Sequence, residues 1–311
     1  MAVTRADIDA AAQRIAPLVR ATPTMTVDGA QLDGAGTVSL KLELVQHSGS
    51  FKARGASNHL LATEVRPDGV VAASGGNHGA AVAWAARELG HAANIFVPTI
   101  SARAKVDRLR SYGAVVHQVG AVYAEALAAS REFLANGDAT SVHAYEDELV
   151  VAGAGTTGRE FDDQAPGLDA VLVACGGGGL VAGIATWFAE TDVEVVACET
   201  EGTAAWARAI EAGRPVPVEV SGIAADALGA TSVGELAFTQ LQGAGAGSVV
   251  VSDDDVTAAQ ALLWDRFRVM TEPSAAVPVA AVLSGAYPLE ADRHVGIVVC
   301  GANTGGPLPG G

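Results

Sequence analysis

The sequence has 311 residues, half of them hydrophobic and 17% charged, which excludes a disordered chain and a collagen-like one. With 35 acidic against 19 basic residues, its net charge of -16 disfavours nucleic acids and anionic membranes as partners. The length suggests about two domains. The three cysteines, Cys175, Cys198 and Cys300, are odd in number and far apart, so we expect free thiols and a cytoplasmic protein.

No segment of the sequence indicates targeting to a membrane. The first 23 residues carry acidic and polar side chains at helical spacing, without the basic region and apolar core of a secretory signal. One uncharged stretch, residues 170–189, is long enough to span a bilayer, but its four consecutive glycines, 176–179, disfavour a continuous helix. We interpret this stretch as a strand, a loop and a helix.

Short apolar runs alternate with alanine-rich stretches of helical spacing through most of the chain. Strands are expected at residues 39–45, 69–74, 94–98, 114–119, 169–175, 193–198, 248–252 and 294–300. Helices are expected at residues 78–90, 102–113, 124–137 and 254–269. This repetition predicts an α/β fold of mainly parallel sheets flanked by helices, in two lobes with a cleft between them.

Only three lysines, Lys41, Lys52 and Lys105, are available for covalent chemistry at an amine. Lys41 lies in an expected strand and Lys105 in an exposed helix, whereas Lys52 ends a loop rich in serine and glycine and precedes a helix. The positive pole of that helix and the apolar Phe51 both disfavour the ammonium, which lowers the pKa of Lys52. Lys52 is therefore the candidate nucleophile, although this segment taken alone is more typical of an ordinary loop lysine.

A second motif joins the strand at 69–74 to the next helix. It consists of Ser74, Gly75, Gly76, Asn77 and His78. Glycine amides at a helix N-terminus can hold a carboxylate or phosphate, and Asn77 can both donate and accept hydrogen bonds. A glycine-rich turn capped by Asn77 explains the segment as well, and His78 is favoured as a packing residue over a base.

The glycines at 176–179 also connect a strand to a helix, which predicts a phosphate-binding loop. Gly177, Gly179 and Gly183 match a loose dinucleotide pattern too, and Glu199 lies about 20 residues further on, where a ribose-binding acid is found. An NAD-dependent dehydrogenase is therefore an alternative, but it leaves the first two motifs without a role.

Cys300 ends the last expected strand, at the edge where parallel sheets present functional groups. Taken alone, it is more typical of a buried, inert thiol.

Together these segments resemble the serine/threonine dehydratase family of pyridoxal-phosphate enzymes, which has the tryptophan-synthase-β-like fold (fold type II). HSGSFKARGA (47–56) is similar to the family's Schiff-base motif, SGGNHG (74–79) to its Ser-x-Gly-Asn-His loop and GGGGLVAG (176–183) to its phosphate loop. EPSAA (272–276) and CGAN (300–303) are similar to two further family segments. The motifs follow the family's order over nearly the whole chain.

The resemblance implies a role for each motif. Lys52 would form the Schiff base with pyridoxal phosphate, Asn77 would bond its phenolic oxygen, and Cys300 would face its pyridine nitrogen. Its phosphate would be held by Gly176, Gly177, Gly178 and Gly179. The substrate would be bound by Ser74, Gly75, Gly76, Asn77 and His78.

The resemblance also implies how the chain is organised. Residues 1–47 and 144–311 would form a large cofactor-binding domain and residues 48–143 a small mobile domain, in a homodimer. Two departures stand out. Glu199 lacks the nearby aspartate with which some members bind a cation, so no metal site is expected, and Ala227 replaces a glycine found in many members.

The function implied is a dehydratase that converts a β-hydroxy amino acid, L-serine or L-threonine, to a 2-oxo acid and ammonia, with Lys52 removing the Cα proton. A serine racemase of the same fold is the nearest alternative, but racemases of this family carry a serine where this chain has Gly75. A protein that binds the cofactor without turnover is a further alternative.

Overall fold

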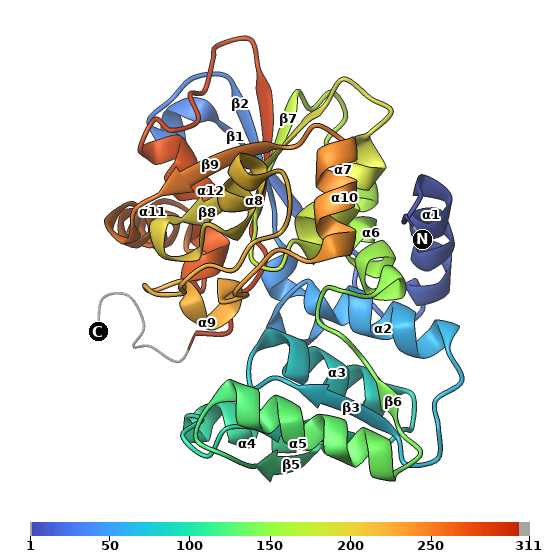
Figure 1. Ribbon diagram of the computed structural model, residues 1–311. Helices are drawn as coiled ribbons and strands as arrows, with labels where there is room; N and C mark the ends of the chain where they lie inside the picture. The colour runs from blue at the N-terminus through green and yellow to red at the C-terminus, as the bar shows by residue number, and fades with distance from the viewer. Residues whose placement is uncertain (1, 305–311) are drawn as a thin grey trace.

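The computed structural model describes residues 2–304 and forms two lobes, each built on its own sheet (Figure 1). The larger lobe has a six-stranded sheet in the order β1-β2-β10-β7-β8-β9, and the smaller has a four-stranded sheet in the order β5-β4-β3-β6. All neighbouring strands are parallel except β1 and β2. The fold class expected from the sequence is therefore confirmed.

The strands are β1 (Thr24–Asp28), β2 (Thr37–Lys41), β3 (Val70–Ala73), β4 (Ala93–Val97), β5 (Val115–Gln118), β6 (Thr140–Ser141), β7 (Ala170–Ala174), β8 (Glu194–Thr200), β9 (Gly247–Val251) and β10 (His294–Val298). The α-helices are α1 (Arg5–Ile15), α2 (Lys52–Ala62), α3 (Asn77–Glu88), α4 (Arg103–Ser111), α5 (Tyr123–Asn136), α6 (Glu148–Gln164), α7 (Gly179–Phe188), α8 (Ala205–Ala212), α9 (Ala225–Leu228), α10 (Glu235–Gly243), α11 (Asp253–Phe267) and α12 (Pro273–Leu283). Short 3₁₀ turns are η1 (Gly29–Leu32), η2 (Glu43–Val45), η3 (His47–Gly49) and η4 (Glu201–Thr203).

The eight expected strands and four expected helices all occur, and residues 170–189 form β7, a glycine loop and α7. One expectation was wrong in extent: the strand at 39–45 ends at Lys41, and residues 43–45 form η2 instead. The cause is tertiary, because the Glu43 carboxylate turns inward to pair with Arg54. Within residues 2–304, no helix is long and apolar enough to cross a membrane.

The large lobe is built around β7, whose five residues Ala-Val-Leu-Val-Ala are all buried. Such a run suits a strand covered on both faces, and α7 and α12 both pack against β7. The sheet edge at which these parallel strands end faces the smaller lobe (Figure 1). The loop that follows β10 therefore meets the loop that follows β3.

Helix α2 lies between the lobes, where it packs against α6 of the larger lobe and α3 of the smaller one (Figure 1). All strands of the smaller sheet fall within residues 48–143, and all strands of the larger sheet fall outside that range. Where a mobile domain begins stays a prediction.

Candidate active site

Lys52 begins α2 directly after a tight loop in which Ser48 and Gly49 have left-handed backbones, with φ of 59° and 78°. Its amine donates a hydrogen bond to the Ala144 carbonyl oxygen at 2.7 Å. Burial lowers the pKa of Lys52 to about 8, and the nearby Cys300 thiol acts weakly in the opposite direction. The lowered pKa expected from the sequence is thus present, with burial as its main cause.

The Lys52 loop meets the end of β10 directly. The Phe51 amide donates to the Cys300 carbonyl oxygen at 3.1 Å, and Ser50 pairs with Gly301 as an isolated bridge. The Cys300 side chain is buried, and this burial raises the pKa of its thiol well above the usual value. The thiol is therefore neutral at physiological pH.

Asn77 belongs to a hydrogen-bonded group that joins three distant parts of the chain. Its amide nitrogen donates to Glu272 Oε1 at 2.7 Å, and its amide oxygen accepts from Asn303 Nδ2 at 2.7 Å. Asn303 Nδ2 also donates to the Ser48 carbonyl oxygen at 2.7 Å. The loop after β3 is thereby tied to the Lys52 loop and to the segment after β10.

The remaining residues of the loop after β3 differ in their surroundings. His78 is buried, with Nε2 2.9 Å from the Val142 carbonyl oxygen, and burial lowers its pKa to about 3. The ring therefore stays neutral, as suits a packing residue. Ser74 Oγ accepts a hydrogen bond from the Gly76 amide at 3.3 Å, and Gly76 precedes α3 without a side-chain cap.

The glycine loop at 176–179 is enclosed by the side chains of Tyr145 and Ala237 and by the backbone of Leu228. Gly178 has a φ of 89°, which strongly favours glycine. A Cβ at Gly177 would lie 2.5 Å from ring atoms of Tyr145, and a Cβ at Gly178 would lie 2.6 Å from Ala237 Cβ. Among the described residues, the amides of Gly176, Gly177 and Gly178 donate to no protein group. The loop is a tight cradle of free donors at the N-terminus of α7.

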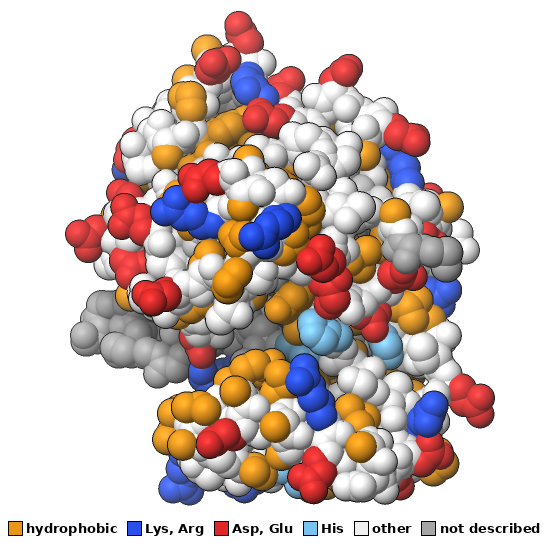
Figure 2. All heavy atoms as spheres, viewed as in Figure 1, with side chains coloured by type: hydrophobic (Ala, Val, Ile, Leu, Met, Phe, Trp, Pro, Cys, Tyr) orange, Lys and Arg blue, Asp and Glu red, His pale blue; other side chains and the backbone are white. Residues whose placement is uncertain are grey.

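The crossover from β6 to α6 connects this cradle to Lys52. Ala144 accepts the Lys52 hydrogen bond, and the ring of the next residue, Tyr145, lies against Gly177. The face seen in Figure 2 is hollowed between the lobes, and histidine side chains lie beside the hollow. Contacts therefore bring the segments of Lys52, Asn77, Cys300 and the glycine loop into one site.

Two residues of this site had no role in the sequence analysis. Glu272 is buried and accepts hydrogen bonds from Asn77, Ser274 Oγ at 2.7 Å and the Asn303 amide at 3.1 Å. Burial raises the pKa of Glu272. The segment EPSAA was a signal for Glu272, whereas nothing local distinguished Tyr145.

Glu199, near the end of β8, is bound by backbone amides. Its carboxylate accepts from the Trp206 and Ala207 amides at 2.7 and 2.9 Å, which caps the N-terminus of α8. An acid engaged in this way is not available to a ribose, which removes the main support for a dehydrogenase. No group of three or more potential metal-ligating side chains occurs in the part of the chain that the structure describes.

Comparison with known proteins identifies the family. Residues 15–301 match the family model described as pyridoxal-phosphate dependent enzyme. The chain belongs to this family. It is 36% identical to a phenylserine dehydratase of Ralstonia pickettii, over 94% of this chain and 90% of that protein.

Two solved structures agree with the assignment. A threonine deaminase of T.th. has a TM-score of 0.91 and 34% identity, covering 98% of this chain and 99% of the other. Maize serine racemase has a TM-score of 0.92 and 30% identity, covering 98% and 94%. The chain is thus a pyridoxal-phosphate-dependent carbon–oxygen lyase of the dehydratase type. The described residues fit this cofactor, since a partly buried amine of lowered pKa lies near a cradle of free amides.

Proposed function

We propose that this enzyme eliminates water from a β-hydroxy amino acid, L-serine or L-threonine, to yield a 2-oxo acid and ammonia. The observation that carries the proposal is the partly buried amine of Lys52, held to Ala144 beside the glycine loop. Such an amine is the chemical requirement for carrying the cofactor and for moving a proton.

Pyridoxal phosphate, when bound, supplies the electron sink that makes the Cα proton of an amino acid acidic. The free amides of Gly176, Gly177 and Gly178 would hold its phosphate, assisted by the positive pole of α7. Asn77, fixed by Glu272 and Asn303, has one N–H left to donate toward it. The neutral Cys300 thiol would face its ring nitrogen.

Lys52 is the proton carrier in this proposal. Its pKa near 8 is well below the ordinary value of 10.5, so a useful fraction of the amine is uncharged at mildly alkaline pH. An uncharged Nζ can take the Cα proton and return it to the leaving hydroxyl or to solvent. The amides and hydroxyl of Ser74, Gly75 and Gly76, at the N-terminus of α3, would hold the substrate carboxylate.

The identity of the substrate is open to a direct experiment. The purified protein would be supplied with pyridoxal phosphate, and its visible band followed before and after borohydride. Release of ammonia and 2-oxo acid would then be assayed with L-serine, L-threonine, 3-hydroxyaspartate and phenylserine. We expect turnover of serine or threonine, and turnover of phenylserine alone would contradict the substrate assignment while retaining the reaction.

A serine racemase is the second candidate, favoured by the likeness to the maize enzyme. Racemisation needs a proton donor opposite Lys52, and Gly75 has no side chain to supply one. A Cβ there would lie 3.4 Å from Val97 Cγ1 and 3.8 Å from Ser101 Oγ, so a serine fits without strain.

Chiral chromatography of L-serine turnover separates the two activities. We expect pyruvate to exceed D-serine strongly, because a positioned acid contributes about 10² to 10⁴ in rate. Gly75→Ser should raise the share of D-serine. D-serine formed as fast as pyruvate by the unaltered enzyme would favour the racemase.

We infer a homodimer in the cytoplasm as the working form. Three free, buried cysteines among the described residues suit a reducing compartment. Gel filtration with light scattering tests the dimer.

A further inference from the structure

Helix α2, which Lys52 begins, has two faces of opposite character. Ala53, Ala56 and Leu60 belong to the apolar core of the smaller lobe. Arg54, Asn58 and His59 point instead at α6 of the larger lobe. The helix is therefore shared between the lobes, and the question is which lobe controls the position of Lys52.

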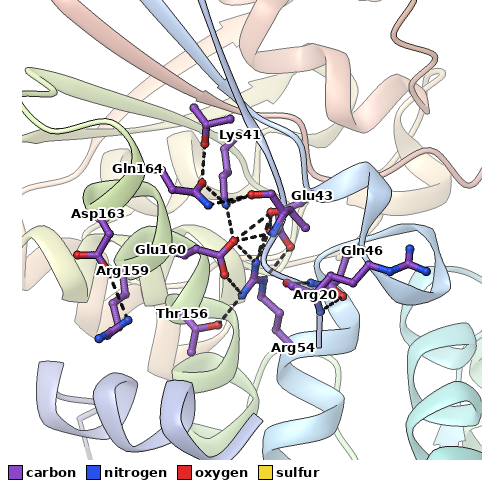
Figure 3. A network of polar contacts seen from close by, with 12 residues as sticks. Arg20, Lys41, Glu43, Gln46, Arg54, Thr156, Arg159, Glu160, Asp163 and Gln164 are labelled. Atoms are coloured by element: carbon purple, nitrogen blue, oxygen red, sulfur yellow. Dashed lines mark hydrogen bonds and ion pairs between the residues drawn. The ribbon is translucent and has the colours of Figure 1, made fainter. Parts of the chain in front are cut away.

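Arg54 lies at the centre of a buried polar network, drawn in Figure 3. Its guanidinium binds Glu43 in a bidentate pair, with Nε 2.8 Å from Oε2 and Nη2 2.7 Å from Oε1. It binds Glu160 of α6 in a second bidentate pair, with both distances 3.0 Å. Lys41 completes the network by donating to Glu160, Gln164 and the Thr22 carbonyl oxygen.

The network is complete in both hydrogen bonds and charge. Nε and both terminal nitrogens of Arg54 have acceptors, since Nη1 also lies 3.4 Å from Thr156 Oγ1, and Lys41 makes three hydrogen bonds. Two cations face two carboxylates. A bidentate fork fixes the direction of the side chain as well as its distance, so Arg54 holds its own turn of the helix in place.

The rest of the same face is also attached to α6. A Cβ at Gly153 of α6 would lie 2.7 Å from the Arg54 carbonyl oxygen and 2.8 Å from Gly55 Cα, so the two backbones are in contact. Asn58 Nδ2 donates to the Leu149 carbonyl oxygen at 2.7 Å, and His59 Nδ1 lies 2.9 Å from Asp147 Oδ2. These contacts follow α2 from its first turn to its last.

The face toward the smaller lobe is apolar. Its members are two alanines and a leucine, which pack without hydrogen bonds of their side chains. Small apolar surfaces can shift by a fraction of a side chain at low cost, whereas a buried bidentate ion pair cannot be parted without exposing unpaired charge. The firm attachment of α2 is therefore to the larger lobe.

We propose that Arg54, through its pairs with Glu43 and Glu160, is a positioning residue that holds Lys52 to the larger lobe while the smaller lobe moves against it. The proposal rests on the proposed role of Lys52 as the cofactor-bearing amine. No side chain caps the first turn of α2. Arg54, two residues after Lys52, holds this turn in place instead. Because the network contains two cations and two carboxylates, it adds little electric field at the Lys52 amine.

The test compares one chemical change at two arginines. Arg54→Lys keeps the charge and loses the double fork, and Arg159→Lys makes the same change one residue before Glu160, where Arg159 pairs with Asp9 of α1. For each variant, the rate of forming the borohydride-reducible adduct of pyridoxal phosphate at Lys52 would be measured and mapped by peptide mass spectrometry. Values of kcat and KM would be measured with the best substrate.

We expect Arg54→Lys to slow adduct formation and lower kcat by about tenfold or more, with KM changed less than about twofold, because the carboxylate-binding loop belongs to the other lobe. Arg159→Lys should alter none of these. If Arg54→Lys is less heat-stable but has the same adduct rate and kcat as the unaltered enzyme, the proposal is overturned, because the network then serves only to stabilise the fold.

A second variant tests the proposal in case Arg54→Lys does not fold. Glu160→Gln keeps the size of the side chain and the Arg54–Glu43 pair but removes one fork, and a fall in kcat and adduct rate is again expected. Unchanged rates in Glu160→Gln would also overturn the proposal. If the unaltered enzyme forms no adduct at Lys52, the proposed function fails; if it does and both variants match it, only the positioning role fails.

Discussion

Two polar regions of this enzyme lie near the start of α2. They differ in whether their hydrogen-bond donors have partners within the protein. The Arg54 network is saturated: cations and carboxylates are equal in number, and each donor has an acceptor. Around Lys52, the amides of Gly176, Gly177 and Gly178 donate to no described protein group. Among the residues that the structure describes, the Lys52 amine donates one hydrogen bond, to the Ala144 carbonyl oxygen.

This difference distinguishes polar groups that stabilise the fold from polar groups that bind a ligand. A buried polar group without a partner is costly, so a region that needs none of its donors for a ligand satisfies them all internally. A binding site keeps donors open for what it binds. The two lysines illustrate the point, because Lys41 is enclosed by three acceptors and Lys52 is not.

The largest contrast is expected between these two lysines. Lys52→Ala should lower the rate of 2-oxo acid formation by about 10³-fold or more, because the proton carrier is lost. Its melting temperature should change little, since only one hydrogen bond is removed. The assay is steady-state turnover combined with thermal unfolding, and a Lys52→Ala protein with near-normal turnover would contradict the role of Lys52 as proton carrier.

Lys41→Met should show the reverse behaviour. Removing one partner from a buried charge network costs about 3 to 5 kcal/mol of unfolding free energy. The expected result is a lower midpoint of urea unfolding, while the protein that remains folded keeps its visible cofactor band. A variant as stable as the parent would show that the network contributes nothing to stability.

Glu199 is a buried carboxylate whose hydrogen-bond partners are backbone amides rather than cations. Burial raises the pKa of Glu199 to about 7 from an ordinary 4.5, whereas Arg54 and Lys41 hold the pKa of Glu160 below its usual value against the effect of its burial. The folded state thus binds more protons than the unfolded state between pH 4.5 and 7, so this group makes stability fall as pH rises through that range.

The shift in the pKa of Glu199 corresponds to about 3 kcal/mol across that window. Glu199→Gln should remove this share of the pH dependence. Urea unfolding of both proteins at about pH 5 and about pH 8 measures it, and identical pH dependence in the two would contradict the raised pKa.

The smallest effect is expected from a substitution that adds one methyl group to the glycine loop. Gly177→Ala would place a Cβ against the Tyr145 ring, and we expect about tenfold weaker cofactor binding, or about 1.4 kcal/mol. Gly243→Ala is the matched control, because it ends α10 with no atom within 4 Å of the added Cβ. Equilibrium titration with pyridoxal phosphate should leave the control unchanged.

Much of the fold was predictable from sequence because its cause is local. Apolar runs that lead into a glycine segment define β3, β7 and β10, and alternation of such runs with helices implies parallel sheets. The glycine motifs then follow at strand ends by chain connectivity alone. Two strands were missed: β1 is a half-exposed edge strand, and β6 has only two residues.

The sequence by itself determined which lysine is the candidate, since each of the three has a distinct local setting, and it determined the glycine loop. Only the tertiary structure decided that Glu272 holds Asn77, that Tyr145 covers Gly177 and that β2 ends where Glu43 turns to Arg54. The reason is physical: these interactions join residues as far as 195 positions apart, and each side chain acquires its partner only when the lobes pack. A spacing rule describes neighbours along the chain, and these residues are neighbours in space alone.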